Sequence, residues 1–267
     1  MNTHTTDPLV RSETHGPVRR LTLNRPGARN ALSEALMAAL QEALAAAAAD
    51  KSVRAVILAA EGPAFSAGHD LKEMTARRAD ADAGKAAFTA IFNQCSQLMQ
   101  TIVRHPRPVI AQVQGIATAA GCQLVASCDL AVASSSARFA TPGVNIGLFC
   151  STPMVALSRN VARKHAMEML LTGEMVSADD ARRMGLVNRV VGPNALDAET
   201  MALAERIASK PVATVKTGKE AFYRQLEQGL SDAYDYTSRV MTENMLAAEA
   251  HEGICAFIDK REPKWPE

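Results

Sequence analysis

The stretch VRAVILAA, residues 53–60, decides the class of fold. An apolar run of this length is typical of a strand that is covered on both faces, as the strands of parallel sheets are. Upstream, residues 18–24 (VRRLTLN) alternate apolar and polar side chains, which indicates a half-buried strand. Between the two lies the alanine-rich segment 33–49, which begins at a typical helix N-cap, Ser33. A strand, a helix and a second strand in this order predict a crossover unit of an α/β fold.

The same alternation continues downstream. Residues 84–104 have a helical pattern, and the sequence HPRP at 105–108 ends it. A strand (109–115), a short helix (120–127) and a further strand (129–134) follow. We therefore expect an α/β architecture with βα crossovers through this part of the chain.

From about residue 196 to residue 260, nearly the whole chain has a helical pattern. Two or three helices cannot bury their own apolar faces, so this region must pack on the rest of the chain or on another subunit. We expect an α/β core of residues 17–195 followed by a helical oligomerisation region of residues 196–267. Residues 1–16 are polar and lack the apolar segment of a signal peptide, so we expect a short flexible lead.

Composition and charge exclude several classes of function. The 267 residues include 29 Lys and Arg against 28 Asp and Glu, and this balance argues against binding to nucleic acid by phosphate neutralisation. No apolar run reaches the roughly 18–20 residues that cross a bilayer, so we expect no membrane span. The five cysteines have no C-x-x-C spacing, which predicts no metal site and reduced thiols in a cytoplasmic protein. Neither a dinucleotide-binding nor an ATP-binding glycine motif is present.

Two segments rich in small residues carry the candidate chemistry. They are FSAGHDL (65–71) and GIATAAGC (115–122), and each follows a predicted strand and precedes a predicted helix. Such bends leave backbone N–H groups unpaired, and two converging N–H groups can bind the oxygen of a thioester as negative charge builds on it. Small residues in these bends could also serve only to let a helix and a strand pack closely, and this alternative stays open.

Taken together, five segments resemble the enoyl-CoA hydratase/isomerase (crotonase) superfamily. They are LNRPGARNAL, FSAGHDLKEM, QGIATAAGCQLVASCDLAVAS, ARFATPGVNIGL and GLVNRVV, within a resemblance that covers about residues 17–262. The resemblance implies a spiral of ββα units with a C-terminal helical region that forms trimers, often paired into hexamers. It also implies an acyl-CoA thioester as substrate, and no separate cofactor, since CoA is part of that substrate.

The resemblance also implies roles for individual residues. The backbone N–H groups of His69 and Ala120 match the two oxyanion donors of the family. Gln123 and Gly143 stand where hydratases of the family have their two catalytic Glu residues. The positions that match CoA contacts are Gly27, Ala28, Arg29, Ala67, Asp70, Leu71 and Lys72, and, in the helical tail, Phe257 and Lys260.

The replacement of both acids puts the reaction itself in question. Gln123 cannot accept a proton at neutral pH and Gly143 has no side chain, whereas one lost acid/base group typically costs 10²–10⁴ in rate. The nearest titratable side chain is that of His69, and Cys122 or Cys150 would be nucleophiles only if a neighbour lowered the pKa. We therefore expect an enzyme that is nominally an enoyl-CoA hydratase of fatty-acid metabolism. The alternatives are a catalytically silent acyl-CoA-binding module, or another thioester reaction such as decarboxylation or hydrolysis.

Overall fold

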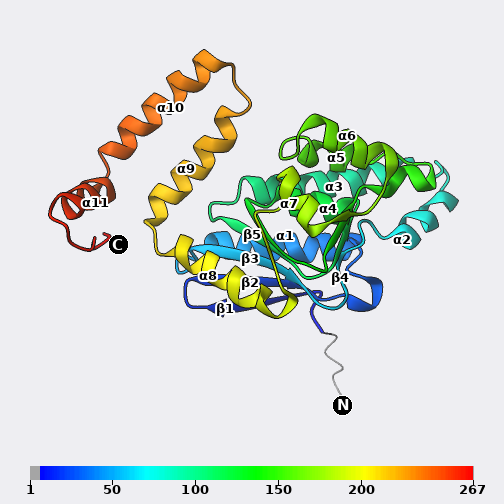
Figure 1. Cartoon of the computed structure of the whole chain (residues 1–267). Helices are drawn as coiled ribbons and strands as arrows, with labels where there is room; N and C mark the ends of the chain where they lie inside the picture. The colour runs from blue at the N-terminus through cyan, green and yellow to red at the C-terminus, as the bar shows by residue number, and fades with distance from the viewer. Residues whose placement is uncertain (1–6, 267) are drawn as a thin grey trace.

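The computed structural model describes residues 7–266, which form two sheets and the helices around them (Figure 1). The strands are β1 (Val10–His15), β2 (Val18–Leu23), β3 (Ala55–Ala60), β4 (Ala64–Ser66), β5 (Val109–Val113), β6 (Ile116–Thr118), β7 (Leu130–Ser134), β8 (Arg138–Ala140), β9 (Val176–Ser177) and β10 (Arg189–Val191). The α-helices are α1 (Glu34–Ala49), α2 (Leu71–Ala76), α3 (Lys85–Val103), α4 (Ala120–Ser127), α5 (Ser151–Leu157), α6 (Arg163–Thr172), α7 (Ala178–Met184), α8 (Leu196–Ala208), α9 (Val212–Gln225), α10 (Leu230–Met245) and α11 (Ala248–Ile258).

The larger sheet has the strand order β1-β2-β3-β5-β7-β10, and only the β1–β2 pair is antiparallel. Its β3 strand is buried on both faces, as the sequence predicts. Val56 and Leu58 point into the main core with α1 and α3, whereas Ala55, Ile57 and Ala59 belong to a second core on the side of α8. Alternate residues of an extended strand face opposite ways, so both layers of helix depend on this one apolar segment.

The smaller sheet has the order β4-β6-β8-β9, in which β4, β6 and β8 are parallel. Each of these strands follows a strand of the larger sheet in the chain: β4 follows β3, β6 follows β5, and β8 follows β7. The chain therefore repeats a unit of two strands, with helices after β4 and β6. This arrangement places the ends of three short parallel strands beside one another.

The N-terminal segment differs from the prediction of a flexible lead over residues 1–16. Residues 10–15 form β1, which pairs in antiparallel register with β2 from Val10 opposite Leu23 to His15 opposite Val18. The expected lead is therefore wrong for β1, while residues 1–6 lie outside the described residues. The pairing was hidden from sequence analysis because β1 (VRSETH) is a half-exposed edge strand with few apolar side chains.

The C-terminal helices fall into two groups. Helix α8 packs on the larger sheet through Leu196, Leu203 and Ala204, so the core extends beyond the predicted boundary at residue 195. Helices α9, α10 and α11 instead project from the body as an extended arm (Figure 1). Most of their large apolar side chains are exposed, including Phe222, Leu226, Leu230, Tyr234, Met241, Met245, Phe257 and Ile258.

One buried ion pair fastens the arm to the body. Lys219 of α9 lies with its Nζ atom 2.6 Å from Oδ2 of Asp129, and the Tyr223 hydroxyl donates to Oδ1 at 2.9 Å. The same carboxylate accepts a hydrogen bond from the backbone N–H of Val109 at 2.7 Å. Desolvation lowers the pKa of Lys219, and the Asp129 charge beside it opposes that shift. Because Asp129 lies between α4 and β7, this contact ties the arm directly to the segment that follows α4.

Lys219→Met should destabilise the chain strongly, because it leaves the Asp129 carboxylate buried without its cation. Removing one partner of a buried pair typically costs about 3–5 kcal/mol, whereas an exposed pair contributes about 0–1 kcal/mol. Glu227→Ala is the matched control, since it removes a partner of Arg159 from an exposed ion pair at 3.3 Å. Urea unfolding of both variants measures the difference, and equal losses of unfolding free energy would contradict the role of the Lys219 pair.

Candidate active site

The candidate site lies at the carboxyl edge of the smaller sheet. The register pairs Ser66 with Ala117 and Thr118 with Ala140, so β4, β6 and β8 end next to one another. The predicted site residues His69, Ala120 and Gly143 lie in the segments that directly follow these strand ends. Ligands of α/β proteins bind outside the carboxyl ends of parallel strands, which agrees with a site here.

In the first bend, the backbone N–H of His69 points away from Leu32, with which His69 forms an isolated parallel β-bridge. The Leu32 N–H donates to the Gly68 carbonyl at 2.7 Å, and the Asp70 N–H donates to the Leu32 carbonyl at 3.3 Å. Both neighbours of His69 thus bond to Leu32, which leaves the N–H of His69 on the opposite side. It donates to no acceptor within residues 7–266. Gly68 permits the turn because its φ is 88°, in the left-handed region.

The second bend starts α4 with an unpaired amide at Ala120. As the first residue of the helix, Ala120 has no intrahelical acceptor for its N–H. Ala119 before it has φ 49° and ψ −118°, a conformation that costs a residue with a side chain about 1–3 kcal/mol. Its N–H donates to the Ala140 carbonyl at 2.9 Å, which fixes the bend on the end of β8.

The two bends touch each other, as the sequence prediction requires. A Cβ atom placed on Gly68 would lie 3.3 Å from the Ala120 nitrogen and 2.9 Å from the Ala119 Cβ. A Cβ atom placed on Gly121 would lie only 2.2 Å from the Ser66 carbonyl oxygen. Helix α4 therefore packs on β4 at a distance that only glycine allows, and this packing brings the two bends into contact.

Several predicted CoA contacts also gather here. The loop Gly27–Arg29 lies beside the first bend, because the Ala67 N–H donates to the Arg29 carbonyl at 3.0 Å. The buried Asn30 side chain holds this loop by donating to the carbonyls of Glu61 and Ala64 at 2.9 and 2.8 Å. Leu71 and Lys72 are exposed at the start of α2, next to the same bend.

Asp70 is occupied by the chain itself. Its Oδ2 atom lies 2.7 Å from Nη1 of Arg25, and its Oδ1 atom accepts the N–H groups of Lys72 and Glu73 as the N-cap of α2. The hydrogen bond from Arg25 is the main reason why the pKa of Asp70 lies below its usual range. The side chain fixes the bend, and both of its oxygens already have partners.

The tail positions are not brought to the site within one chain. Phe257 lies in α11 with 85% of its surface exposed, and Lys260 follows that helix. Figure 1 shows α11 at the end of the arm, away from the body that carries α2 and α4. A contact between these two residues and a ligand at the bends of the same chain is therefore absent from the described structure.

The His69 ring is a neutral group at physiological pH. Its Nε2 atom is buried and has no hydrogen-bond partner within residues 7–266, and its ring meets Phe92 edge-on with centroids 5.5 Å apart. Burial lowers the pKa of His69 to about 4. The ring can therefore donate or accept a single hydrogen bond here, but it carries no charge at pH 7.

Neither position of the expected acids offers a carboxylate. Gln123 is buried in α4, and its Oε1 atom lies 3.9 Å from the Cys95 sulfur. A Cβ atom on Gly143 would lie 2.8 Å from the Leu148 carbonyl oxygen and 3.0 Å from Sγ of Cys150. The loop at residues 148–150 therefore fills the space in which an acidic side chain would begin.

The candidate thiols are not activated. Burial raises the pKa of Cys122 to about 12, and burial also raises the pKa of Cys150. The thiolate is the nucleophilic form, so neither cysteine has the electrostatic setting of a nucleophile. Within the described part of the chain, no three His, Cys, Asp or Glu side chains are grouped so that they could hold a metal ion.

The sequence analysis missed Thr141. This residue directly follows β8, is fully buried, and has a hydroxyl group without a hydrogen-bond partner among the described residues. Its place next to Pro142 and Gly143 puts it at the same sheet edge as the two bends. No sequence pattern marks a single threonine as unpartnered, because that property depends on the surroundings in the folded chain.

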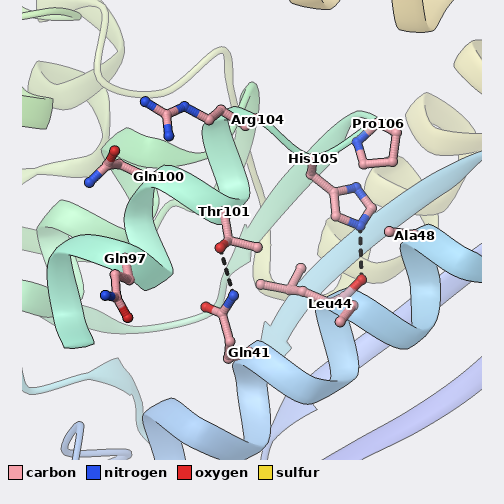
Figure 2. Close-up of a pocket in the computed structure, with 10 residues that line it drawn as sticks. Gln41, Leu44, Ala48, Gln97, Gln100, Thr101, Arg104, His105 and Pro106 are labelled. Atoms are coloured by element: carbon pink, nitrogen blue, oxygen red, sulfur yellow. Dashed lines mark hydrogen bonds between the residues drawn. The ribbon is translucent and has the colours of Figure 1, made fainter.

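A separate cavity of about 450 Å³ lies between α1 and α3 (Figure 2). Two hydrogen bonds join groups that line it: Gln41 Nε2 donates to Thr101 Oγ1 at 2.6 Å, and His105 Nε2 lies 3.1 Å from the Leu44 carbonyl oxygen. Neither bend lines it, and Thr101 is about 13 Å along α3 from Phe92, the residue that touches His69. We interpret this cavity as a gap in the packing between α1 and α3, separate from the candidate site.

A family model described as enoyl-CoA hydratase/isomerase matches residues 13–267. The chain belongs to the enoyl-CoA hydratase/isomerase family. A human protein named "Enoyl-CoA hydratase domain-containing protein 3, mitochondrial" is 50% identical over 248 residues, covering 93% of this chain and 80% of that protein. A crystal structure of an enoyl-CoA hydratase from Mycobacterium smegmatis is 56% identical, with a TM-score of 0.92 and coverage of 97% of this chain and 99% of that one.

A crystal structure of the human domain-containing protein 3 agrees similarly, with 47% identity, a TM-score of 0.91, and coverage of 96% of this chain and 100% of that one. These likenesses confirm the predicted crotonase-like α/β fold of the family. The human relative is named as mitochondrial, so it lends no support to the cytoplasmic location predicted for this chain. No helix within residues 7–266 is long and apolar enough to cross a membrane.

Gly121→Ala should disrupt the candidate site. The added Cβ would overlap the Ser66 carbonyl, so α4 has to move away from β4, and overpacking of this kind costs about 1–3 kcal/mol. Gly192→Ala is the control, because nothing lies within 4 Å of a Cβ there and the change should stay within about 0.5 kcal/mol. Thermal and urea unfolding measure both variants. Wild-type stability in Gly121→Ala would contradict the close packing of the two bends.

His69 should make the stability fall on acidification. Its pKa is about 4 in the folded chain and about 6.5 when unfolded, so only the unfolded state gains this proton between those pH values. Stability therefore drops as the pH is lowered through this window, by about 2–3 kcal/mol near pH 4.5. Urea unfolding measures the free energy of unfolding at pH 7 and at pH 4.5. The decrease between these pH values should be smaller in His69→Gln than in the wild type by this amount. His165→Gln, at an exposed ring, should decline like the wild type.

Proposed function

We propose that this chain binds an acyl-CoA thioester and stabilises the enolate form of its acyl group. The observation that carries the proposal is the contact between the two bends, each of which offers one backbone N–H without an acceptor. A thioester oxygen between His69 N and Ala120 N would receive two hydrogen bonds as its charge grows. Such preorganised donors are among the largest contributions to catalysis, because they need no reorganisation during the reaction.

The CoA part would pass between the loop Gly27–Arg29 and the start of α2. Ala67, Leu71 and Lys72 border this path, and Arg29 and Lys72 offer positive charge to the phosphates. Asp70 would act indirectly, by holding the first bend through Arg25 and the amides of α2.

The arm supports an oligomeric enzyme. Its exposed apolar side chains need a partner surface. Phe257 and Lys260 lie at the end of the arm, away from the bends of their own chain, so they would contact CoA bound to a neighbouring copy. We infer a homotrimer or a pair of trimers, in which α11 of one subunit completes the CoA site of the next. Small-angle scattering and analytical ultracentrifugation test this assembly.

Ordinary hydration should be slow. Water must be activated by a base near the β-carbon, and Gln123 and the crowded Gly143 supply none. Loss of one such group typically lowers the rate by about 10²–10⁴, so we expect hydration at least about a hundredfold below that of a relative with both acids. A silent acyl-CoA-binding module remains the second candidate, and the absence of these carboxylates is the observation that favours it.

One experiment with two readouts tests the proposal. Calorimetry should show binding of butyryl-CoA, and the loss of enoyl absorbance should show at most slow hydration of crotonyl-CoA. Gly143→Glu should not raise the hydration rate, because Leu148 and Cys150 fill the space that the new side chain needs. Failure of every acyl-CoA to bind, or binding that Gly121→Ala leaves unchanged, would overturn the proposed oxyanion site.

A further inference from the structure

The last described residues fold back onto α11. The Glu252 carboxylate accepts two hydrogen bonds from Arg261, from Nη1 to Oε1 at 2.7 Å and from Nη2 to Oε2 at 2.9 Å. Its Oε1 atom also accepts the backbone N–H of Lys264 at 2.6 Å. Trp265 packs on the same helix, since a Cβ atom placed on Gly253 would lie 3.2 Å from its ring. We call these five residues the tail clamp.

The tail clamp fixes geometry more than it stabilises the body. The Arg261 side chain is 41% exposed, and exposed ion pairs contribute little to stability. Two parallel hydrogen bonds between a guanidinium group and a carboxylate do fix the relative orientation of the two groups. The hydrogen bond from Arg261 is also the main reason why the pKa of Glu252 lies at about 2, so the pair stays charged at neutral pH.

The turn between α11 and the tail clamp holds Lys260 in a left-handed conformation. Its φ is 52°, and its N–H donates to the Phe257 carbonyl at 3.3 Å. The next N–H, that of Arg261, donates to the Ala256 carbonyl at 3.0 Å. These two bonds form a Schellman motif, in which glycine is the usual residue at the left-handed position because a side chain is strained there. Lys260 therefore carries a strain that glycine would not have.

Strained residues of this kind also lie at the candidate site. Within residues 7–266, five residues other than glycine have a positive φ, and Arg29, Asn30 and Ala119 are three of them. Backbone strain that the surrounding structure maintains is typical of functional positions. Lys260 follows α11 at the end of the arm, away from the site of its own chain (Figure 1). What lysine offers there, and glycine does not, is a positive charge on a long, exposed side chain.

We propose that the tail clamp positions Lys260 for the phosphates of CoA, with Glu252 as the positioning residue. This inference rests on the proposed acyl-CoA function and on the assembly inferred with it. Glu252 holds Arg261, the residue directly after Lys260, and thereby keeps the strained turn closed. The Lys260 ammonium group then pairs with a phosphate of CoA bound to the neighbouring copy. Glu252 does not touch the ligand, because both of its oxygens already accept hydrogen bonds within the clamp.

Glu252→Gln tests the clamp, because it removes the charge that holds Arg261 and keeps the shape of the side chain. Calorimetry on the whole protein measures the binding of butyryl-CoA and of butyryl-pantetheine, which lacks the nucleotide and all of the phosphates. We expect the Kd of butyryl-CoA to rise at least about fivefold, and that of butyryl-pantetheine to stay within about twofold. Glu243→Gln, the same change at an exposed residue of α10, should leave both Kd values unchanged.

Lys260→Gly separates the strain from the charge. Glycine relieves the left-handed turn, so the backbone amides of α11 should exchange their hydrogens no faster than in the wild type. The Kd of butyryl-CoA should nevertheless rise at least about tenfold, because the charge is lost. Lys260→Arg keeps the charge and should bind within about threefold of the wild type.

The outcomes separate this inference from the proposed function. Equal weakening of both thioesters by Glu252→Gln, no weakening of either, or wild-type binding of butyryl-CoA by Lys260→Gly would overturn the inference and leave the acyl-CoA site standing. Dissociation of Glu252→Gln into monomers, measured by analytical ultracentrifugation, would also overturn it, since the clamp would then hold the assembly. Failure of the wild type to bind either thioester would overturn the proposed function itself.

Discussion

The carbonyl oxygen of Ser66 occupies the place where any side chain at residue 121 would begin. Because residue 121 has no side chain, the first turn of α4 can pack on the end of β4, and the two bends come into contact. The amide of Ala120 and the turn that contains His69 both belong to this contact. The glycines at 68 and 121 therefore act by leaving room, and the backbone of the neighbouring strand is what uses that room.

The elements with strong local patterns could be predicted from the sequence. The apolar run of β3 and the Ser33 cap of α1 are properties of neighbouring residues, and both lie where the pattern placed them. The polar edge strand β1 could not be found in this way, because its support comes from β2 rather than from its own side chains. The smaller sheet was equally hidden, since β4, β6 and β8 have only three residues each, too few to show a period.

The site shows the same division. The two bends could be predicted because small residues between a strand and a helix are visible in the sequence. The crowding at Gly143 comes from the Leu148 carbonyl and the Cys150 sulfur, and the unpaired state of Thr141 comes from its burial. These properties arise only when several strand ends meet. The sequence analysis therefore recognised which acids are missing, but not what replaces them in space.

The crowding at Gly143 also bears on how such a site can change over generations. A mutation that places an acid at residue 143 meets the Leu148 carbonyl before the new side chain can extend. The loop at residues 148–150 would have to move first, and that earlier change brings no catalytic benefit while residue 143 is still glycine. Descendants of this chain should therefore keep Gly143 even where selection favours an acid, because the route to an acid at this position passes through a less well packed intermediate.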